Sequence, residues 1–320
     1  MKKIDSIRTI GVAGAGIMGP GIAQVFIQNG YDVILHDLTD EILRRAMDRI
    51  QLNQKSLIKR DLLSEDGAER ARNRLTATTD RENLKDVDFL VEAITEEMDT
   101  KKDFFTTMDR LVQKGAIFVS NTSGLSITKI SEKMARKGQF AGMHWWNPPH
   151  LIPLVEVIKG DKTTEETAKL VMDLSARLGK KPVLVLKDAP GFIGNRLQFA
   201  LFREALHIVE QAIASPEDVD MAMKMGLGFR LPIIGPFETA DLGGLDTFYA
   251  ISCYLFKEIS SETEPPPWLK TLVEKNHLGV KTGMGFYDYP GDTDRKVIGR
   301  RDRKFLDMIK YIFPEKDPDG

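Results

Sequence analysis

Cysteine, excess charge of one sign and long apolar runs are scarce in this 320-residue chain. Its one cysteine, Cys253, excludes an internal disulfide and a cysteine-based zinc site, and it fits a reducing compartment. A formal net charge of −2 indicates neither a nucleic-acid-binding protein nor a polybasic membrane-surface protein. No apolar run approaches the roughly 20 residues of a membrane span, and the N-terminus has no apolar signal-peptide core. We therefore predict a cytoplasmic protein that binds neither nucleic acid nor a membrane.

The first half of the chain alternates short β-rich runs with helical stretches. The composition, 42% hydrophobic and 29% charged, is that of a globular protein long enough for two domains. Strands that alternate with helices predict a mostly parallel sheet covered on both faces, so we expect an α/β fold with a Rossmann-type doubly wound sheet. The runs expected to form strands are Thr9–Gly14, Asp32–Asp37, Phe89–Ile94, Ala116–Asn121, Phe140–Trp145, Leu154–Lys159 and Pro182–Lys187.

Two stretches of this first half have the apolar spacing of helices. Ile17–Asn29 follows the first expected strand, with apolar residues three to four positions apart. The charged segment Thr39–Thr78 carries leucine, isoleucine and methionine at wider intervals. We expect it to form a helical hairpin that protrudes from the sheet.

The pattern becomes wholly helical near Lys187. We place a domain boundary there, between residues 1–187 and an all-helical C-terminal domain, residues 188–320. This second domain is expected to begin with a helix over Phe192–Ala214 and to end with a charged helix over Arg295–Asp319. Its helices carry more apolar surface than a domain of this size needs for its own core, which predicts a homodimer.

A glycine-rich turn lies between the first expected strand and the first expected helix. Gly14–Gly19 reads G-x-G-x-x-G, with Ile17 and Met18 before the last glycine. In dinucleotide sites the first glycine makes the tight turn, the second, here Gly16, lets a pyrophosphate approach, and the third packs helix on strand. Asp37 ends the second expected strand, where a carboxylate can bind a ribose and repel a 2′-phosphate. The motif predicts NAD rather than NADP; the alternative is a tight turn that binds no nucleotide.

A histidine and a glutamate stand on two later strand-like runs. His144 ends one apolar run, and Glu156 interrupts the next between Val155 and Val157. A carboxylate among β-branched residues needs a partner, because an unpaired buried charge is costly. A neutral histidine can be that partner, and such a pair is a general base near neutral pH. The alternative is a surface histidine and an outward-facing glutamate.

These motifs, taken together, resemble the 3-hydroxyacyl-CoA dehydrogenase family. The likeness runs over nearly the whole chain, and several collinear motifs are more specific than any one of them. The resemblance implies an N-terminal Rossmann-type domain, a helical C-terminal domain that dimerises and binds substrate, and a role in fatty acid metabolism. The motifs that carry it are Gly14–Gly19, Val91–Ile94, Ser120–Ser123, His144–Asn147, Leu154–Ile158, Asp188–Arg196, Gly235–Phe237 and Lys281–Tyr287.

The resemblance also implies roles for individual residues. His144 matches the family's catalytic base and Glu156 the carboxylate that orients it. Ser123 matches the serine that contacts the substrate oxygen, and Asn195 the asparagine that reaches in from the helical domain. The positions that match NAD-contacting residues are Ala93, Glu96, Lys101, Asn147 and Lys281.

Structural alternatives remain open for several of these residues. Ser123 could cap a helix that begins near Ser126. Asn195 could be an ordinary residue at a helix N-terminus, and Lys281 a solvated lysine. Glu92 is expected to have a structural rather than a catalytic role.

The chain departs from the family pattern beside the histidine. Trp145 and Trp146 stand where the family usually has two phenylalanines, and Gly124 replaces a second serine. In a strand the two tryptophans must point to opposite faces, so one should be core and the other should face the site. The following loop, residues 147–153, resembles family branches that oxidise small alcohols without CoA, namely gulonate, carnitine and pyridine-carboxylate dehydrogenases. Within it, His150 could contact a substrate carboxylate or be incidental.

The expected reaction is the NAD-dependent interconversion of a 3-hydroxyacyl-CoA, such as 3-hydroxybutyryl-CoA, and its 3-oxo form. The cations Lys55, Lys59 and Arg60 lie where acyl-CoA enzymes contact CoA phosphates, although a charge run is more often a solvated face. The first alternative is the same chemistry on a hydroxy acid or a hydroxymethyl pyridine carboxylate. A remote alternative is a paralogue that binds NAD without turnover.

Overall fold

The computed structural model describes residues 3–289 and 293–312. The chain forms two compact units, and the division falls between Arg196 and Leu197. The first compact unit thus extends nine residues beyond Lys187, where the sequence predicted the domain boundary. A compact unit need not coincide with a functional domain, so that boundary stays a prediction. Each unit is described by itself below.

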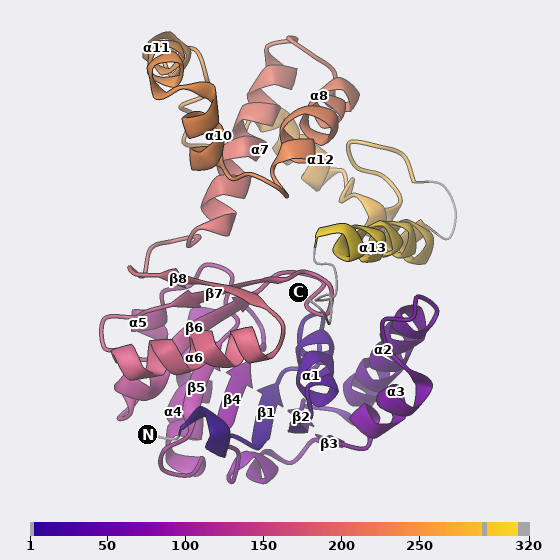
Figure 1. The fold of residues 1–320 in the computed structure, drawn as a ribbon, viewed down its shortest axis with the longest axis vertical. Helices are drawn as coiled ribbons and strands as arrows, with labels where there is room; N and C mark the ends of the chain where they lie inside the picture. Colours follow the sequence, from indigo (N-terminus) through magenta and orange to yellow (C-terminus); the bar gives the residue numbers. More distant parts are fainter. Residues whose placement is uncertain (1–2, 290–292, 313–320) are drawn as a thin grey trace, which may run out of the picture. The chain divides into compact units, whose positions relative to one another are not determined.

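The first unit is built on one eight-stranded sheet in the order β3-β2-β1-β4-β5-β6-β7-β8 (Figure 1). Neighbouring strands are parallel except β6 and β7, which are antiparallel. The predicted doubly wound α/β fold is therefore confirmed. The strands are β1 (Thr9–Ala13), β2 (Asp32–His36), β3 (Leu75–Thr78), β4 (Phe89–Glu92), β5 (Ile117–Ser120), β6 (Phe140–Trp145), β7 (Leu154–Ile158) and β8 (Lys181–Val185).

Helices cover both faces of this sheet, because the strands are apolar on both sides. One buried cluster joins α1, α2 and α6 to one face, where Val91 of β4 points. A second cluster joins α4 and α5 to the opposite face, where the neighbouring Leu90 points. The helices and helical turns of this unit are η1 (Ile4–Ser6), α1 (Gly19–Gln28), α2 (Asp40–Ile58), α3 (Glu65–Arg72), η2 (Arg81–Leu84), α4 (Met98–Leu111), α5 (Ile127–Ile130), η3 (Lys137–Gln139) and α6 (Glu165–Arg177).

The expected hairpin over Thr39–Thr78 is partly wrong. Its helices α2 and α3 form and pack on α1, but Leu75–Thr78 is the edge strand β3, paired in parallel with β2. The strand has four residues and none of them is buried. Its sequence therefore lacks the buried apolar run that identified the other strands.

The second unit is helical, as expected. Its first helix, α7 (Gly194–Glu210), begins in the first unit and is shorter than the predicted Phe192–Ala214. Phe192 and Ala212 have φ angles of 51° and 54°, a left-handed conformation that cannot continue a helix at either end. The further elements are α8 (Pro216–Ala222), η4 (Met223–Leu227), α9 (Gly228–Arg230), α10 (Pro236–Gly243), α11 (Leu245–Leu255), α12 (Pro267–Glu274), η5 (Val280–Thr282) and α13 (Thr293–Ile312).

The helix predicted for the C-terminal tail is present as α13 over 293–312, and the rest of that prediction, residues 313–319, lies outside the described residues. No helix in the described part of the chain is long and apolar enough to cross a membrane.

Candidate active site

The antiparallel pairing of β6 and β7 places His144 directly opposite Glu156. The two side chains share a face of the sheet, and His144 Nδ1 lies 2.8 Å from Glu156 Oε2. Both residues are buried, the glutamate completely. The contact predicted from the two strand-like runs is therefore present, and the alternative of two outward-facing side chains is wrong.

Glu156 is surrounded by hydrogen-bond donors. Besides His144, it accepts from Trp146 Nε1 (3.2 Å) and from the backbone N–H groups of Ile193 and Gly194 (2.9 Å each). Burial raises the pKa of Glu156, but the hydrogen bonds from His144 and from the backbone outweigh burial and hold that pKa below its usual range. The carboxylate is thus ionised at neutral pH and only accepts, so the Nδ1 of a neutral His144 carries the proton. Its Nε2 is then free to accept another.

Ser123 and Asn195 are held together near the start of α7. Asn195 Nδ2 donates to the backbone oxygen of Ser123 (2.8 Å), and Ser123 N donates to Glu96 Oε1 (2.8 Å). The residue before Asn195, Gly194, donates to Glu156. Gly194 and Asn195, adjacent at the start of α7, therefore bind Glu156 and Ser123 respectively, and so connect the His144–Glu156 pair to Ser123.

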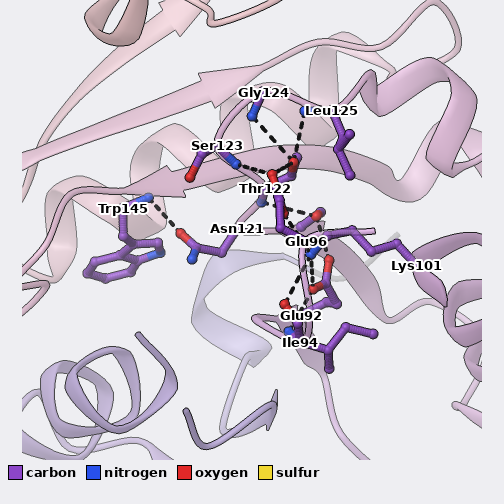
Figure 2. Close-up of polar contacts among 11 residues, drawn as sticks. Glu92, Ile94, Glu96, Lys101, Asn121, Thr122, Ser123, Gly124, Leu125 and Trp145 are labelled. Atoms are coloured by element: carbon purple, nitrogen blue, oxygen red, sulfur yellow. Dashed lines mark hydrogen bonds and ion pairs between the residues drawn. The ribbon is translucent and has the colours of Figure 1, made fainter. Parts of the chain in front are cut away.

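The capping alternative for Ser123 is wrong. Helix α5 is capped by Ser126, whose Oγ accepts from Lys129 N (3.2 Å). Ser123 itself is exposed and its hydroxyl has no role in that cap. Thr122 donates its hydroxyl to Glu96 Oε1 (2.5 Å) and accepts from Leu125 N (3.0 Å), which shapes the turn that presents Ser123 (Figure 2).

A buried ionic network supports this turn (Figure 2). Lys101 is almost completely buried and forms ion pairs with Glu92 and with Glu96, the latter at 3.2 Å. Glu92 also accepts from Ser120 Oγ (2.5 Å). Burial raises the pKa of Glu92 above its usual range in spite of the opposing charge of Lys101. Because the Lys101 amine is engaged with two carboxylates, it fixes Glu96; its predicted contact with NAD stays a prediction.

The two tryptophans face opposite sides of β6, as predicted. Trp145 is core: its ring packs 6.1 Å from that of Phe26, and its backbone N–H donates to Asn121 Oδ1 (2.9 Å) (Figure 2). Trp146 is half-buried on the site side, with its ring 5.7 Å from that of His144. Trp146 is therefore the one that shapes the site.

A cavity of about 820 Å³ opens at the glycine-rich turn. A Cβ atom at Gly14 would lie 2.3 Å from the Ala93 oxygen, and one at Gly19 would lie 1.7 Å from the Gly14 oxygen, so both positions require glycine. A Cβ atom at Gly16 would have no atom within 4 Å, which leaves space for a phosphate group at the helix N-terminus. The turn therefore has the form that a dinucleotide pyrophosphate needs.

Asp37 lies at the same cavity with a fixed carboxylate. Its Oδ2 accepts from Ala15 N (2.5 Å) and its Oδ1 from Leu38 N (2.6 Å). This orientation suits hydrogen bonds to a ribose. The other predicted cofactor residues that line the cavity are Gly14, Gly16, Ile17 and Ala93.

The remaining predicted cofactor residues do not line this cavity. Met18 is half-buried just before α1, and Asn147 is exposed directly after β6. Lys281 is exposed in η5 of the second unit. Their contacts with NAD, like that of Glu96, stay predictions.

Sequence reasoning missed two cationic features. Arg49 of α2 lines the dinucleotide cavity, and its Nη1 donates to the oxygens of Gly16 (3.3 Å) and Ile17 (3.4 Å). Lys180 is buried, and its Nζ donates to the oxygens of Pro149 (2.6 Å) and Ile152 (2.9 Å). Burial lowers the pKa of Lys180 to about 8. Neither the arginine nor the lysine has a sequence signal that separates it from a solvated surface charge.

Comparison with known proteins identifies the family to which the chain belongs. Residues 9–189 match the NAD binding domain of 3-hydroxyacyl-CoA dehydrogenase, and residues 191–289 match its C-terminal domain. The chain belongs to the 3-hydroxyacyl-CoA dehydrogenase family. It is thus an NAD-dependent dehydrogenase of the kind that acts on CH–OH groups, and the predicted cofactor is confirmed.

Relatives of two kinds match nearly the whole chain. A probable 3-hydroxybutyryl-CoA dehydrogenase of Deinococcus radiodurans is 40% identical over 87% of this chain and 99% of its own. The 5-formyl-3-hydroxy-2-methylpyridine 4-carboxylate 5-dehydrogenase of Mesorhizobium japonicum is 33% identical over 96% of this chain and 98% of its own. The crystal structure of a 5-dehydrogenase of that name, described as an NAD+ dependent dismutase, has a TM-score of 0.89 and 32% identity, and covers 97% of this chain and 100% of that one.

Proposed function

We propose that His144 and Glu156 form the general base of this dehydrogenase. The observation that carries the proposal is the 2.8 Å contact between His144 Nδ1 and a fully buried, ionised carboxylate. Because Nδ1 donates to Glu156, Nε2 can take the proton of a substrate hydroxyl, and the carboxylate stabilises the imidazolium that forms.

The substrate oxygen is proposed to bind Ser123 and Asn195. Two hydrogen bonds to that oxygen fix the direction of the carbinol C–H bond, and this orientation lowers the activation barrier for hydride transfer. As the O–H proton passes to His144 Nε2, the C–H bond is broken and a carbonyl forms. Bound NAD supplies the acceptor for the hydride. Glu96 fixes the position of Ser123, because it accepts a hydrogen bond from Ser123 N and forms an ion pair with the buried Lys101.

The cofactor is proposed to bind along the cavity at the glycine-rich turn. The backbone at Gly16 would receive the pyrophosphate, and Asp37 would bind the adenosine ribose. The remaining contacts proposed from the family resemblance are Ile17, Met18, Ala93, Glu96, Lys101, Asn147 and Lys281.

The first candidate substrate is a 3-hydroxyacyl-CoA such as 3-hydroxybutyryl-CoA, which would place the enzyme in fatty acid metabolism. The 40% identity to the Deinococcus protein supports this candidate. Lys55 and Lys59 also support it, because both are exposed at the end of α2, where they could contact CoA phosphates.

The second candidate is a compact alcohol without CoA, either a hydroxy acid or a hydroxymethyl pyridine carboxylate. A specific observation favours it: the Trp146 ring lies 5.7 Å from the His144 ring, at a position where the family usually has the smaller phenylalanine. The near-complete match to the pyridine-carboxylate enzyme points the same way. A paralogue that binds NAD without turnover is opposed by the presence of Ser123, His144, Glu156 and Asn195 together.

One experiment separates these candidates. NADH formation would be followed with NAD and 3-hydroxybutyryl-CoA, its longer homologues, free 3-hydroxy acids and hydroxymethyl heteroaromatic carboxylates. The first candidate predicts efficient turnover of the thioesters. Negligible thioester rates beside good rates with a free carboxylate would select the second candidate. If no compound reduced NAD while the protein still bound NADH, the non-catalytic alternative would stand.

We also propose that the protein is a cytoplasmic homodimer. Among the described residues of the second unit, large apolar side chains such as Phe229, Phe237 and Tyr249 are exposed. A monomer rarely leaves so many apolar side chains in water, and a second copy could cover them. Light scattering should report twice the 36.0 kDa mass of one chain; a single-chain mass at micromolar concentration would overturn the proposal.

A further inference from the structure

The Trp146 indole shares an acceptor with His144. Its Nε1–H donates to Glu156 Oε2, the same oxygen that pairs with His144 Nδ1. We propose that Trp146 is a positioning residue that sets the pH at which His144 can act as a base, by donating to the carboxylate that orients it. This inference rests on the proposed His144–Glu156 base.

The indole is held in place by the backbone at the start of α7. A Cβ atom added to Gly194 would lie 2.2 Å from Trp146 Cζ2 and 3.1 Å from its Cε2. The ring therefore packs flush against a glycine, and no other residue type leaves room for it at that position. Because the N–H of Gly194 also donates to Glu156, the same residue receives the ring and binds the carboxylate.

The direction of the effect follows from the charges around the pair. Glu156 Oε2 divides its negative charge between two donors, so the indole weakens the attraction between that oxygen and an imidazolium. A weaker attraction lets the imidazole lose its proton at a lower pH. Without the indole N–H, the oxygen would hold the imidazolium more tightly, and the base would become available only at higher pH.

The surroundings of the pair contain few other charges that could produce the same effect. On β8, the residue opposite Glu156 is Val183, and the chain before α7 contributes the Phe192 ring, 5.8 Å from that of His144. The first charged side chain of α7, Arg196, donates to the Pro190 oxygen (3.5 Å). Beyond Ser123, Glu96 is paired with Lys101. On the other face of β6, Lys180 lies over the Trp145 ring at 5.5 Å.

The chain allows this hydrogen bond to be removed almost alone. It has three tryptophans, and the Nε1 atoms of Trp145 and Trp268 are buried without a hydrogen-bond partner among the described residues. Replacing all three by benzothienylalanine, in a tryptophan-auxotrophic host, exchanges each indole N–H for sulfur and keeps the ring shape. Among the described residues, the hydrogen bond from Trp146 Nε1 to Glu156 is then the one indole hydrogen bond that the exchange removes.

The primary readout is the proton on His144 in the protein without substrate. With carbon-13-labelled histidine rings, the His144 titration should move to higher pH by about 0.5 unit, since a hydrogen bond of about 1 kcal/mol converts to somewhat less than one pH unit. The acid limb of kcat/KM for alcohol oxidation should move in the same direction and by the same amount. A titration midpoint and an acid limb both within about 0.1 unit of the native protein would overturn the inference.

Two ordinary variants separate positioning from packing. Trp146→Phe should move the acid limb upward in the same way. Trp145→Phe removes a neighbouring indole that makes no side-chain hydrogen bond, so it should lower stability and leave the acid limb in place. If both variants moved the limb equally, a packing effect would replace our account. The proposed base and the proposed role of Trp146 can fail separately. Full turnover of His144→Gln would show that His144 is not the base. The titration of His144, compared between the native and the benzothienylalanine-substituted proteins, would still test whether Trp146 affects its proton.

Discussion

In the first unit, apolar side chains are buried on both faces of the sheet, whereas Leu206 and Leu306 are the buried apolar residues described in the second unit. The exposed apolar side chains of that second unit include Phe237, which is 86% exposed. A parallel sheet covered by helices completes its own core, but short helices in a small unit do not. The residues proposed for catalysis, His144, Glu156, Ser123 and Asn195, all belong to the first unit, whose core is complete.

The largest expected effect comes from separating the units. A fragment of residues 1–196 should unfold cooperatively and bind NADH, because its core is closed and it carries the whole glycine-rich turn. A fragment of residues 197–320 should not fold as a monomer. It should dimerise, aggregate or fail to fold, because its exposed apolar side chains need a second copy to cover them. Denaturant unfolding monitored by circular dichroism checks both. A cooperative, monomeric second fragment would contradict the comparison.

The next prediction tests whether the Ser123 hydroxyl binds the substrate oxygen. Ser123→Ala should lower kcat/KM by about 10- to 100-fold, since the substrate oxygen loses a hydrogen bond in the transition state. The matched control is Ser126→Ala, which removes the cap of α5 and should cost about 1 kcal/mol of the free energy of unfolding while turnover is kept. Equal losses of turnover in the two variants would return Ser123 to a structural role.

A smaller effect concerns the buried amine of Lys180. Burial lowers its pKa to about 8 from an ordinary 10.5, so the folded protein holds this proton less tightly than the unfolded chain. The free energy of unfolding, measured relative to Lys180→Met, should therefore rise between about pH 8 and about pH 10.5, by at most about 3 kcal/mol. Urea unfolding of both proteins across that window checks this. A flat or falling difference would show that the two carbonyl hydrogen bonds fully offset burial.

The smallest effect concerns the choice between NAD and NADP, which we attribute to Asp37 of the first unit. Asp37→Ser should narrow the preference for NADH over NADPH by about tenfold, because the carboxylate no longer repels a 2′-phosphate. Fluorescence titration with both reduced cofactors measures it. Asp103→Ser is a suitable control, since Asp103 lines the same cavity but is not the acid that directly follows β2. A native protein that bound both cofactors equally would remove Asp37 from its role.

Local patterns predicted the features that depend on periodicity. Strand alternation put Trp145 and Trp146 on opposite faces, and the cost of an unpaired buried carboxylate pointed to His144 as the partner of Glu156. The antiparallel register that sets the two residues opposite each other came only from the structure. Glycine spacing predicted the dinucleotide turn, because the close approaches at Gly14 and Gly19 are properties of that local motif.

Features that depend on distant segments could not be predicted in the same way. The backbone groups of Ile193 and Gly194 reach Glu156 across a long separation in sequence, and Phe192 enters that turn with a left-handed φ angle that nothing in its residue type suggests. Lys101 looks like its exposed neighbours, yet it is buried because Glu92 and Glu96 converge on it. Strand β3 was missed because an edge strand of four residues needs no buried run.

The most direct test of the account is the turnover of His144→Gln beside its affinity for NADH. With the best substrate of the panel and saturating NAD, kcat should fall by about 10²- to 10⁴-fold, while the dissociation constant for NADH changes little, because the imidazole acts on a proton and not on the dinucleotide. His277→Gln, the same exchange in the second unit, should leave both values unchanged. A His144→Gln protein with near-native kcat would contradict the central claim that this histidine is the base.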